Sequence, residues 1–287
     1  MQVIAHIGIL ISFVGCNIVA LKERKYRPNQ TVVKTLGPSD EPSKIKVVTL
    51  ASLRTAGIED DADKGKRCRV NDEKLAESVR RAKSKIFEIA FCNPWQWFFT
   101  GTLDPGKFDR TDLDTYHKTL TQWIRDCKKA TGADVKFLLI PELHKDGKSW
   151  HMHGFLMGLP PDKLRQFRIG DRMGQAVAEK VAAGDAVYDW PAYRERFGWC
   201  DLEPIRSAEA VSKYITKYIS KGLAQSVKEM NAHLYYRSRG LREATEVARG
   251  SMSAGTLTEP SYVGDYASVW WLDYSPDLLQ SITDSIT

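Results

Sequence analysis

The sequence contains no Cys-x-x-Cys pair, and its 5 cysteines are scattered along 287 residues. This pattern argues against a disulfide framework and a cysteine zinc site, and it is typical of a reducing compartment. The phosphate-binding pattern GxxxxGK[ST] is absent as well, and the residues after Lys221 are too few for an ATPase domain. We therefore expect no fused helicase or other P-loop ATPase.

The first 21 residues contain no acidic or basic side chain, and no basic stretch precedes them as a secretory signal would require. This apolar segment is just long enough to span a bilayer. Three interpretations stay open: a membrane anchor, which we do not favour, a buried strand or helix, and residues upstream of the native start. Residues 22–64 are rich in Pro, Lys, Ser and Asp and complete a loosely structured N-terminal arm, residues 1–64. We expect the main domain over residues 65–245 and a C-terminal tail over residues 246–287.

Positive charge exceeds negative charge by 6 and is clustered, for example in KERKYR, KGKRCR, RRAKSK and RSRGLR. A net positive charge of this size favours a polyanionic partner only mildly. Any one cluster, taken alone, is typical of a solvated surface.

From about residue 66 the apolar pattern becomes regular. Apolar residues at helical spacing predict a helix over 73–90 and a second one from about 113 to 127, with Thr111 and Asp114 placed like a capping box. Strands are predicted over 97–103, 135–144, 150–158 and near 199–205. A basic stretch from Pro161 is predicted to be helical, as is a tyrosine-containing segment from Ala208. Strands that alternate with helices and also form a hairpin predict an α+β fold.

Two histidines lie two positions apart on a predicted strand, so His151 and His153 leave the same face of a sheet. Asp146-Gly147 predicts a tight turn between this strand and the preceding one. That turn would place Glu142 opposite His151, and His144 opposite Ser149. Opposed residues have Cβ atoms roughly 5 Å apart on one face, and a one-residue slip would destroy the arrangement.

This convergence favours a metal site over an ordinary polar surface patch. Glu142, His151 and His153 are the first choice of ligands, and His144 is a substitute or a supporting partner. A mixed imidazole and carboxylate set does not select one ion, since zinc, manganese and magnesium all accept such ligands.

The segment YITKYISK places Tyr214 and Tyr218 one helical turn apart, with Lys217 and Lys221 each three positions after a tyrosine. An ordinary amphipathic helix with tyrosines at its rim would show the same spacing. A tyrosine hydroxyl can also be a covalent nucleophile. It attacks phosphorus well where a metal polarises the phosphoryl oxygens and a cation stabilises the developing charge.

The sequence resembles the HUH single-strand endonucleases, and among them the rolling-circle replication initiators of bacteriophages and plasmids in their two-tyrosine form. Three segments match in the family's order: FFTGTL (98–103), HMHGF (151–155) and YITKYISK (214–221). The resemblance covers roughly residues 66–245. The tyrosines follow the histidines, which favours an initiator over a conjugative relaxase. Gly101 departs from the first motif, where a hydrophobic residue is usual.

The resemblance implies an antiparallel sheet of about five strands flanked by helices, with the histidines on a central strand facing the tyrosines. It implies Mg²⁺ or Mn²⁺ on Glu142, His151 and His153. One tyrosine, expected to be Tyr214, would nick single-stranded DNA at an origin through a 5′-phosphotyrosine link. The other would attack the regenerated junction, while Lys217 and Lys221 orient DNA or stabilise charge.

The same resemblance implies a cytoplasmic protein of a bacterial host cell that works with a host helicase and a host polymerase. Basic residues near the motifs are expected to contact the DNA backbone: Arg206, Lys213, Arg237 and Arg239.

Three alternatives remain. A two-tyrosine transposase would use the same chemistry on transposon ends. A non-catalytic single-stranded DNA-binding protein would never form a covalent adduct. A zinc hydrolase that uses the His and Glu residues would not need the tyrosines.

Overall fold

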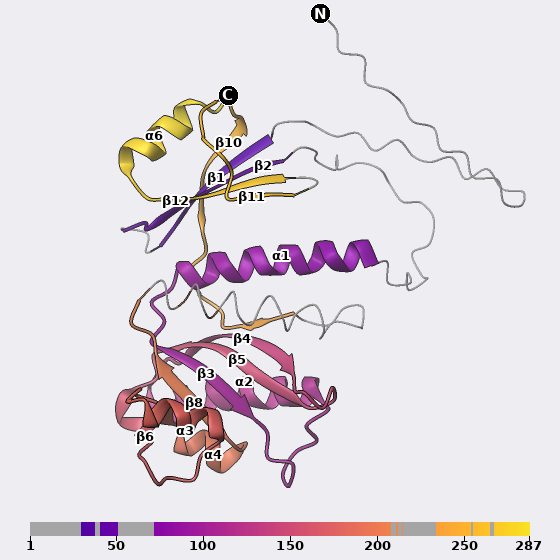
Figure 1. Cartoon of the computed structure of the whole chain (residues 1–287), viewed down its shortest axis with the longest axis vertical. Coiled ribbons are helices and arrows are strands. Elements are labelled where there is room, and N and C mark those ends of the chain that lie inside the picture. Colours follow the sequence, from indigo (N-terminus) through magenta and orange to yellow (C-terminus); the bar gives the residue numbers. More distant parts are fainter. Residues whose placement is uncertain are drawn as a thin grey trace, which may run out of the picture.

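The computed structural model describes residues 30–37, 41–50, 72–207, 211, 214, 234–253, 255–264 and 267–287. Over these residues the chain forms two antiparallel sheets, one of seven strands and one of five. Figure 1 shows the long helix α1 (Asp72–Phe91) between the two sheets. The fold is therefore α+β, as the sequence predicts.

The seven-stranded sheet carries the first and second sequence motifs. Its strand order is β6-β7-β8-β3-β5-β4-β9 over the described residues. The excess over the five strands expected comes from three strands of two residues each, β6, β7 and β9. The strands are β3 (Trp97–Thr102), β4 (Lys136–Leu143), β5 (Trp150–Met157), β6 (Arg165–Gln166), β7 (Tyr188–Asp189), β8 (Cys200–Pro204) and β9 (Tyr236–Arg237).

The β4–β5 hairpin has the register that its turn predicts. Glu142 pairs with His151, and the His144 amide donates to the Ser149 carbonyl at 2.8 Å. The Asp146 carboxylate accepts hydrogen bonds from the two amides that follow Gly147, each at 2.8 Å. Gly147 has φ +68°, a left-handed conformation that glycine adopts at little cost. Local turn chemistry thus fixes which side chains of the two strands meet.

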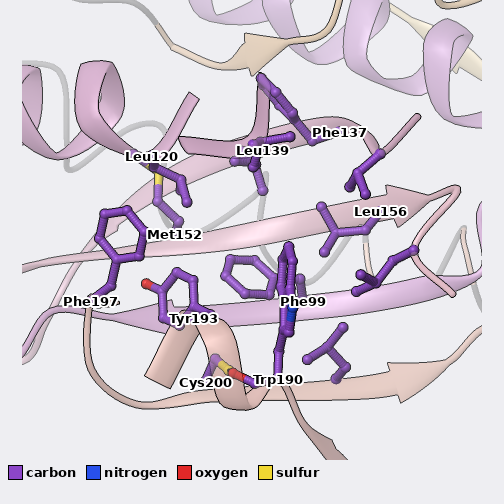
Figure 2. Close-up of a cluster of buried hydrophobic side chains, with 14 of the residues drawn as sticks. Phe99, Leu120, Phe137, Leu139, Met152, Leu156, Trp190, Tyr193, Phe197 and Cys200 are labelled. Carbon is purple, nitrogen blue, oxygen red and sulfur yellow. The ribbon is translucent and has the colours of Figure 1, made fainter. Parts of the chain in front are cut away.

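One face of this sheet packs on helices α2 (Leu113–Thr131) and α4 (Pro191–Arg196). Figure 2 shows this core, in which Phe99 and Met152 from the sheet meet Leu120 of α2 and Tyr193 of α4. The N-cap of α2 differs from the prediction. Asp112 accepts from the Thr115 amide at 2.9 Å, while the Thr111 hydroxyl bonds to Asp109 instead.

The opposite face packs on α1. Ile86 and Ile89 of α1 lie against Phe98, Leu138 and Phe155 of the sheet. Two residues of the predicted tyrosine helix lie in the described part of the chain and are helical, Val211 and Tyr214. Both pack against this second core. The rest of residues 208–233 lies outside the described residues.

The region after β5 differs from the continuous helix predicted from Pro161. A 3-10 turn (Pro161–Lys163) is followed by β6, and helix α3 (Gln175–Ala182) begins much later. Gly170 has φ +94°, which no ordinary helix accommodates, so the stretch before α3 is a loop.

The second sheet corrects the expectation of a loose arm and tail. Its strand order is β10-β1-β2-β12-β11 over the described residues, so N-terminal and C-terminal segments pair. Helix α6 (Pro276–Asp284) packs on it through the buried Ile282. The strands are β1 (Gln30–Leu36), β2 (Lys44–Leu50), β10 (Thr245–Ser251), β11 (Tyr262–Val263) and β12 (Ala267–Asp273).

Among the described helices, none combines the length and the apolar character needed to cross a bilayer. The apolar segment 1–21 lies outside the described residues.

Candidate active site

The candidate site occupies the polar part of the sheet face that α1 covers at its apolar part. Side chains alternate along β5, so Met152 and Leu156 enter the α2 core while Phe155 enters the α1 core. His151 and His153 share the face of Phe155. The same alternation on β4 places Glu142 on this face with Leu138 and Ile140. The predicted ligands therefore do lie together.

Each histidine has one ring nitrogen held by a threonine of β3. Thr102 Oγ1 lies 2.8 Å from His151 Nδ1, and Thr100 Oγ1 lies 3.3 Å from His153 Nδ1. A hydroxyl that accepts from Nδ1–H leaves the lone pair on Nε2. Histidines that bind metals are commonly oriented in this way by a partner on the other nitrogen.

Glu142 and His153 make the closest contact between the predicted ligands. Glu142 Oε2 lies 2.9 Å from His153 Nε2. With Nδ1 donating to Thr100, two lone-pair-bearing atoms come this close only with a positive charge between them. A proton on His153 or a cation shared by both groups provides it.

His151 is neutral at physiological pH and has an open coordination position. Burial lowers its pKa to about 4, and the nearby charges of His153, His144 and Arg110 add to this effect. Its Nε2 atom is buried and has no hydrogen-bond partner in the described part of the chain. A buried polar atom without a partner is costly unless something binds it.

These donors fit a divalent cation in kind and orientation. Over the described residues, however, no three His, Cys, Asp or Glu side chains already converge as metal ligands do. The Glu142–His153 contact would have to open to admit an ion. His144 is an exposed neighbour, with its ring centroid 4.8 Å from that of His151 and Nδ1 3.7 Å from the Asp146 carboxylate.

Tyr214 lies beside these histidines across β3. Its ring stacks on Phe98 with centroids 4.0 Å apart and planes at 9°. Phe98 in turn lies parallel to the His153 ring, with centroids 6.3 Å apart. The Tyr214 hydroxyl donates to Glu203 Oε2 at 3.1 Å. Lys180 binds the other oxygen of Glu203 at 2.7 Å.

Sequence reasoning missed the contributions of β8 and of the loop before α2. Asp201 pairs with Thr100 in the β3–β8 register and accepts a hydrogen bond from it, while burial raises the pKa of Asp201 to about 6. Arg110 lies near His151, and its Nε is buried without a partner among the described residues. The alternation in CDLEP was a usable signal, since Cys200 and Leu202 are buried and the two acids share the other face.

The structure does not gather all the predicted DNA contacts at the site. Arg206 is exposed just after β8. Arg237 lies on the edge strand β9 and is paired with Glu243, which also binds Lys85. Arg239 is exposed in the turn that follows. Four predicted residues lie outside the described residues: Lys213, Lys217, Tyr218 and Lys221.

The segment that contains all these motifs has a known relative. Residues 96–223 match the family of the replication-associated protein ORF2. The match covers less than half of the chain and omits the five-stranded sheet. It supports a replication-related role of the initiator kind. No curated protein and no solved structure matches the chain.

Proposed function

We propose that this protein is a rolling-circle replication initiator of the HUH type. It nicks single-stranded DNA at an origin and rejoins it through a 5′-phosphotyrosine intermediate. The observation that carries the proposal is the joint placement of paired histidines, a carboxylate and a stacked tyrosine on one sheet face. The family match over residues 96–223 supports the replication role.

Glu142, His151 and His153 would hold Mg²⁺ or Mn²⁺, with His144 as the substitute ligand. The bound ion would polarise the phosphoryl oxygens of the scissile phosphate. The chain's own contribution is orientation. Thr102 and Thr100 fix the Nδ1 sides of the two imidazoles, so that both Nε2 atoms are presented as ligands.

Tyr214 is the proposed first nucleophile. Its Oη would form a bond to phosphorus as the bond from phosphorus to the 3′-oxygen breaks, and the leaving oxygen would take a proton from solvent. Glu203 already accepts the Tyr214 hydroxyl hydrogen bond, so its carboxylate is the nearest acceptor for the tyrosine proton. Lys180 holds that carboxylate in place.

Tyr218 would act after one round of synthesis, when it attacks the regenerated junction and the freed 3′-hydroxyl reseals the circle. Lys217 and Lys221 would stabilise charge at the phosphate. The protein would rely on a host helicase for unwinding and a host polymerase for extension, in the cytoplasm of a bacterial cell.

The test is a covalent-adduct assay. The protein is incubated with Mn²⁺ and single-stranded DNA from its own gene neighbourhood and is then run on a denaturing gel. We expect a shifted band that EDTA abolishes. Tyr214→Phe should remove the band formed in the first cut, because phenylalanine has no nucleophilic oxygen. Tyr262→Phe, an exposed tyrosine on β11, is the matched control and should leave the band intact.

The alternatives give different results in the same assay. DNA cleavage that survives replacement of both Tyr214 and Tyr218 by phenylalanine would contradict the tyrosine mechanism and favour a metal-dependent hydrolase. Binding without any adduct, with or without metal, would favour a non-catalytic single-strand binder. An adduct that forms only on the terminal sequences of a transposon would favour a transposase.

A further inference from the structure

An exposed tryptophan lies between arginines at the start of β8. Trp199 keeps 39% of its surface exposed, although most large apolar side chains of the described residues are buried. The Arg194 guanidinium lies 4.2 Å from the centre of its ring, and that of Arg172 lies 5.8 Å away. No step of the proposed reaction uses these three residues.

The backbone and one arginine of this group are firmly held. The Trp199 carbonyl accepts from the Thr102 amide at 2.8 Å. The preceding Gly198 has φ +137°, and a Cβ there would lie 2.5 Å from the Asp104 amide nitrogen. Arg194 is anchored to Asp189, a carboxylate only 2% exposed, at 2.9 Å. The ring is therefore presented on a rigid support, a property that lowers the entropic cost of binding.

The neighbouring loop adds positive charge. Arg165, Arg168 and Arg172 are exposed between β6 and α3 or lie at its edge. Arg165 is paired with Asp171 at 2.7 Å. Arg168 and Arg172 make no ion pair with any residue that the structure describes. Cations next to an exposed aromatic ring suit a ligand that combines flat bases with phosphates.

This group also lies close to the histidines. The Thr102 residue that binds the Trp199 carbonyl through its amide binds His151 through its side chain. Only β3 separates β8 from β5, so the two outer strands lie about 10 Å apart. That span corresponds to about three nucleotides at the spacing of a DNA strand.

We propose that Trp199, supported by Arg194 and flanked by Arg172, is a base-stacking subsite for single-stranded DNA beside the cleaved phosphate. This inference rests on the proposed function. A base stacks on the exposed part of the indole ring, and Arg168 and Arg172 contact the adjoining phosphates. Such stacking needs a π-face and not a particular sequence, so the subsite would hold the strand without selecting the origin.

The test measures binding alone, in the full-length Tyr214→Phe protein with EDTA, so that no DNA is cut. Two labelled oligonucleotides of roughly twelve nucleotides are compared, an oligothymidylate and a strand of equal length with abasic sites. Trp199→Ala should weaken oligothymidylate binding about 5- to 100-fold and leave abasic binding unchanged. Trp199→Phe should retain most of the affinity. Arg172→Gln should reduce the slope of log affinity against log salt by about 1.

The control is Tyr262→Ala, because Tyr262 is an exposed aromatic residue on the other sheet. It should change neither affinity. Equal loss on both oligonucleotides by Trp199→Ala, or no loss on either, would overturn the subsite. If an adduct still forms in the nicking assay, the proposed function survives that result. Failure of the Tyr214→Phe protein to bind either strand would reject both the subsite and the proposed function.

Discussion

Thr100 and Thr102 show how small residues define the chemistry of this site. The two histidines and the glutamate are the ligands that a chemist would select from the sequence, but their orientation depends on hydroxyls from a neighbouring strand. Those hydroxyls lie 2.8 Å from His151 and 3.3 Å from His153. Nothing in the spacing of FFTGTL alone identifies them as partners of residues about fifty positions later.

Thr102→Val tests this orienting role. Valine keeps the shape of threonine but removes the hydroxyl, so His151 loses the group that fixes its Nδ1 side. We expect Mn²⁺ affinity, measured by isothermal titration calorimetry, to fall about 10- to 100-fold. Thr102→Ser restores a hydroxyl and should recover most of that affinity. Unchanged Mn²⁺ binding in Thr102→Val would show that the threonine does not orient a ligand.

The β4–β5 hairpin is the element that assembles the site, and it was predictable because its information is local. Asp146 and Gly147 encode the turn, and strand alternation then fixes the face of every side chain. The cap of α2 was mispredicted for a related reason. Asp109, Thr111 and Asp112 all offer short polar side chains, and only the path of the loop decides which of them caps the helix.

Gly154 allows β4 and β5 to approach closely at the centre of this hairpin. A Cβ there would lie 2.0 Å from the Leu138 carbonyl oxygen. Gly154→Ala should therefore lower the free energy of unfolding by about 3 kcal/mol or more, because backbone would have to move in the middle of the sheet. Urea denaturation followed by circular dichroism measures this loss.

Gly147→Ala is the matched comparison in the same hairpin. Nothing lies within 4 Å of a Cβ at that position, and its φ is +68°. Only the left-handed backbone opposes the substitution, at a cost of about 1–2 kcal/mol. A larger loss for Gly147→Ala than for Gly154→Ala would contradict the close-approach argument.

At the scale of the whole molecule, α1 joins the two sheets. Its Ile86 and Ile89 pack on the seven-stranded sheet. On its other side Glu88 binds Lys46 of β2 at 2.6 Å, and the Phe87 ring lies 4.4 Å from that of Trp271 on β12. Burial lowers the pKa of Lys46, and Glu88 partly offsets this effect. The five-stranded sheet is thus attached to the seven-stranded sheet through this helix.

Glu88→Leu should uncouple this attachment. It leaves the Lys46 ammonium, whose side chain is 4% exposed, buried without its close carboxylate partner. We expect a loss of about 3–5 kcal/mol in unfolding free energy, with faster amide hydrogen exchange in β2. The double variant Lys46→Met/Glu88→Leu removes both charges and should regain most of that stability. Equal instability of the single and double variants would show that the buried charge is not the cause.

The sequence by itself determined the features that depend on neighbouring residues: the α+β class, α1, the hairpin with its register, and the candidate ligand set of Glu142, His151 and His153. Only the tertiary structure decided what depends on distant segments. It paired β1 with β10 across more than two hundred residues of sequence, and it brought Thr102, Glu203 and Arg110 to the site. Local spacing records the period of a strand or a helix, whereas contacts between distant elements depend on how whole faces pack, which no short pattern encodes.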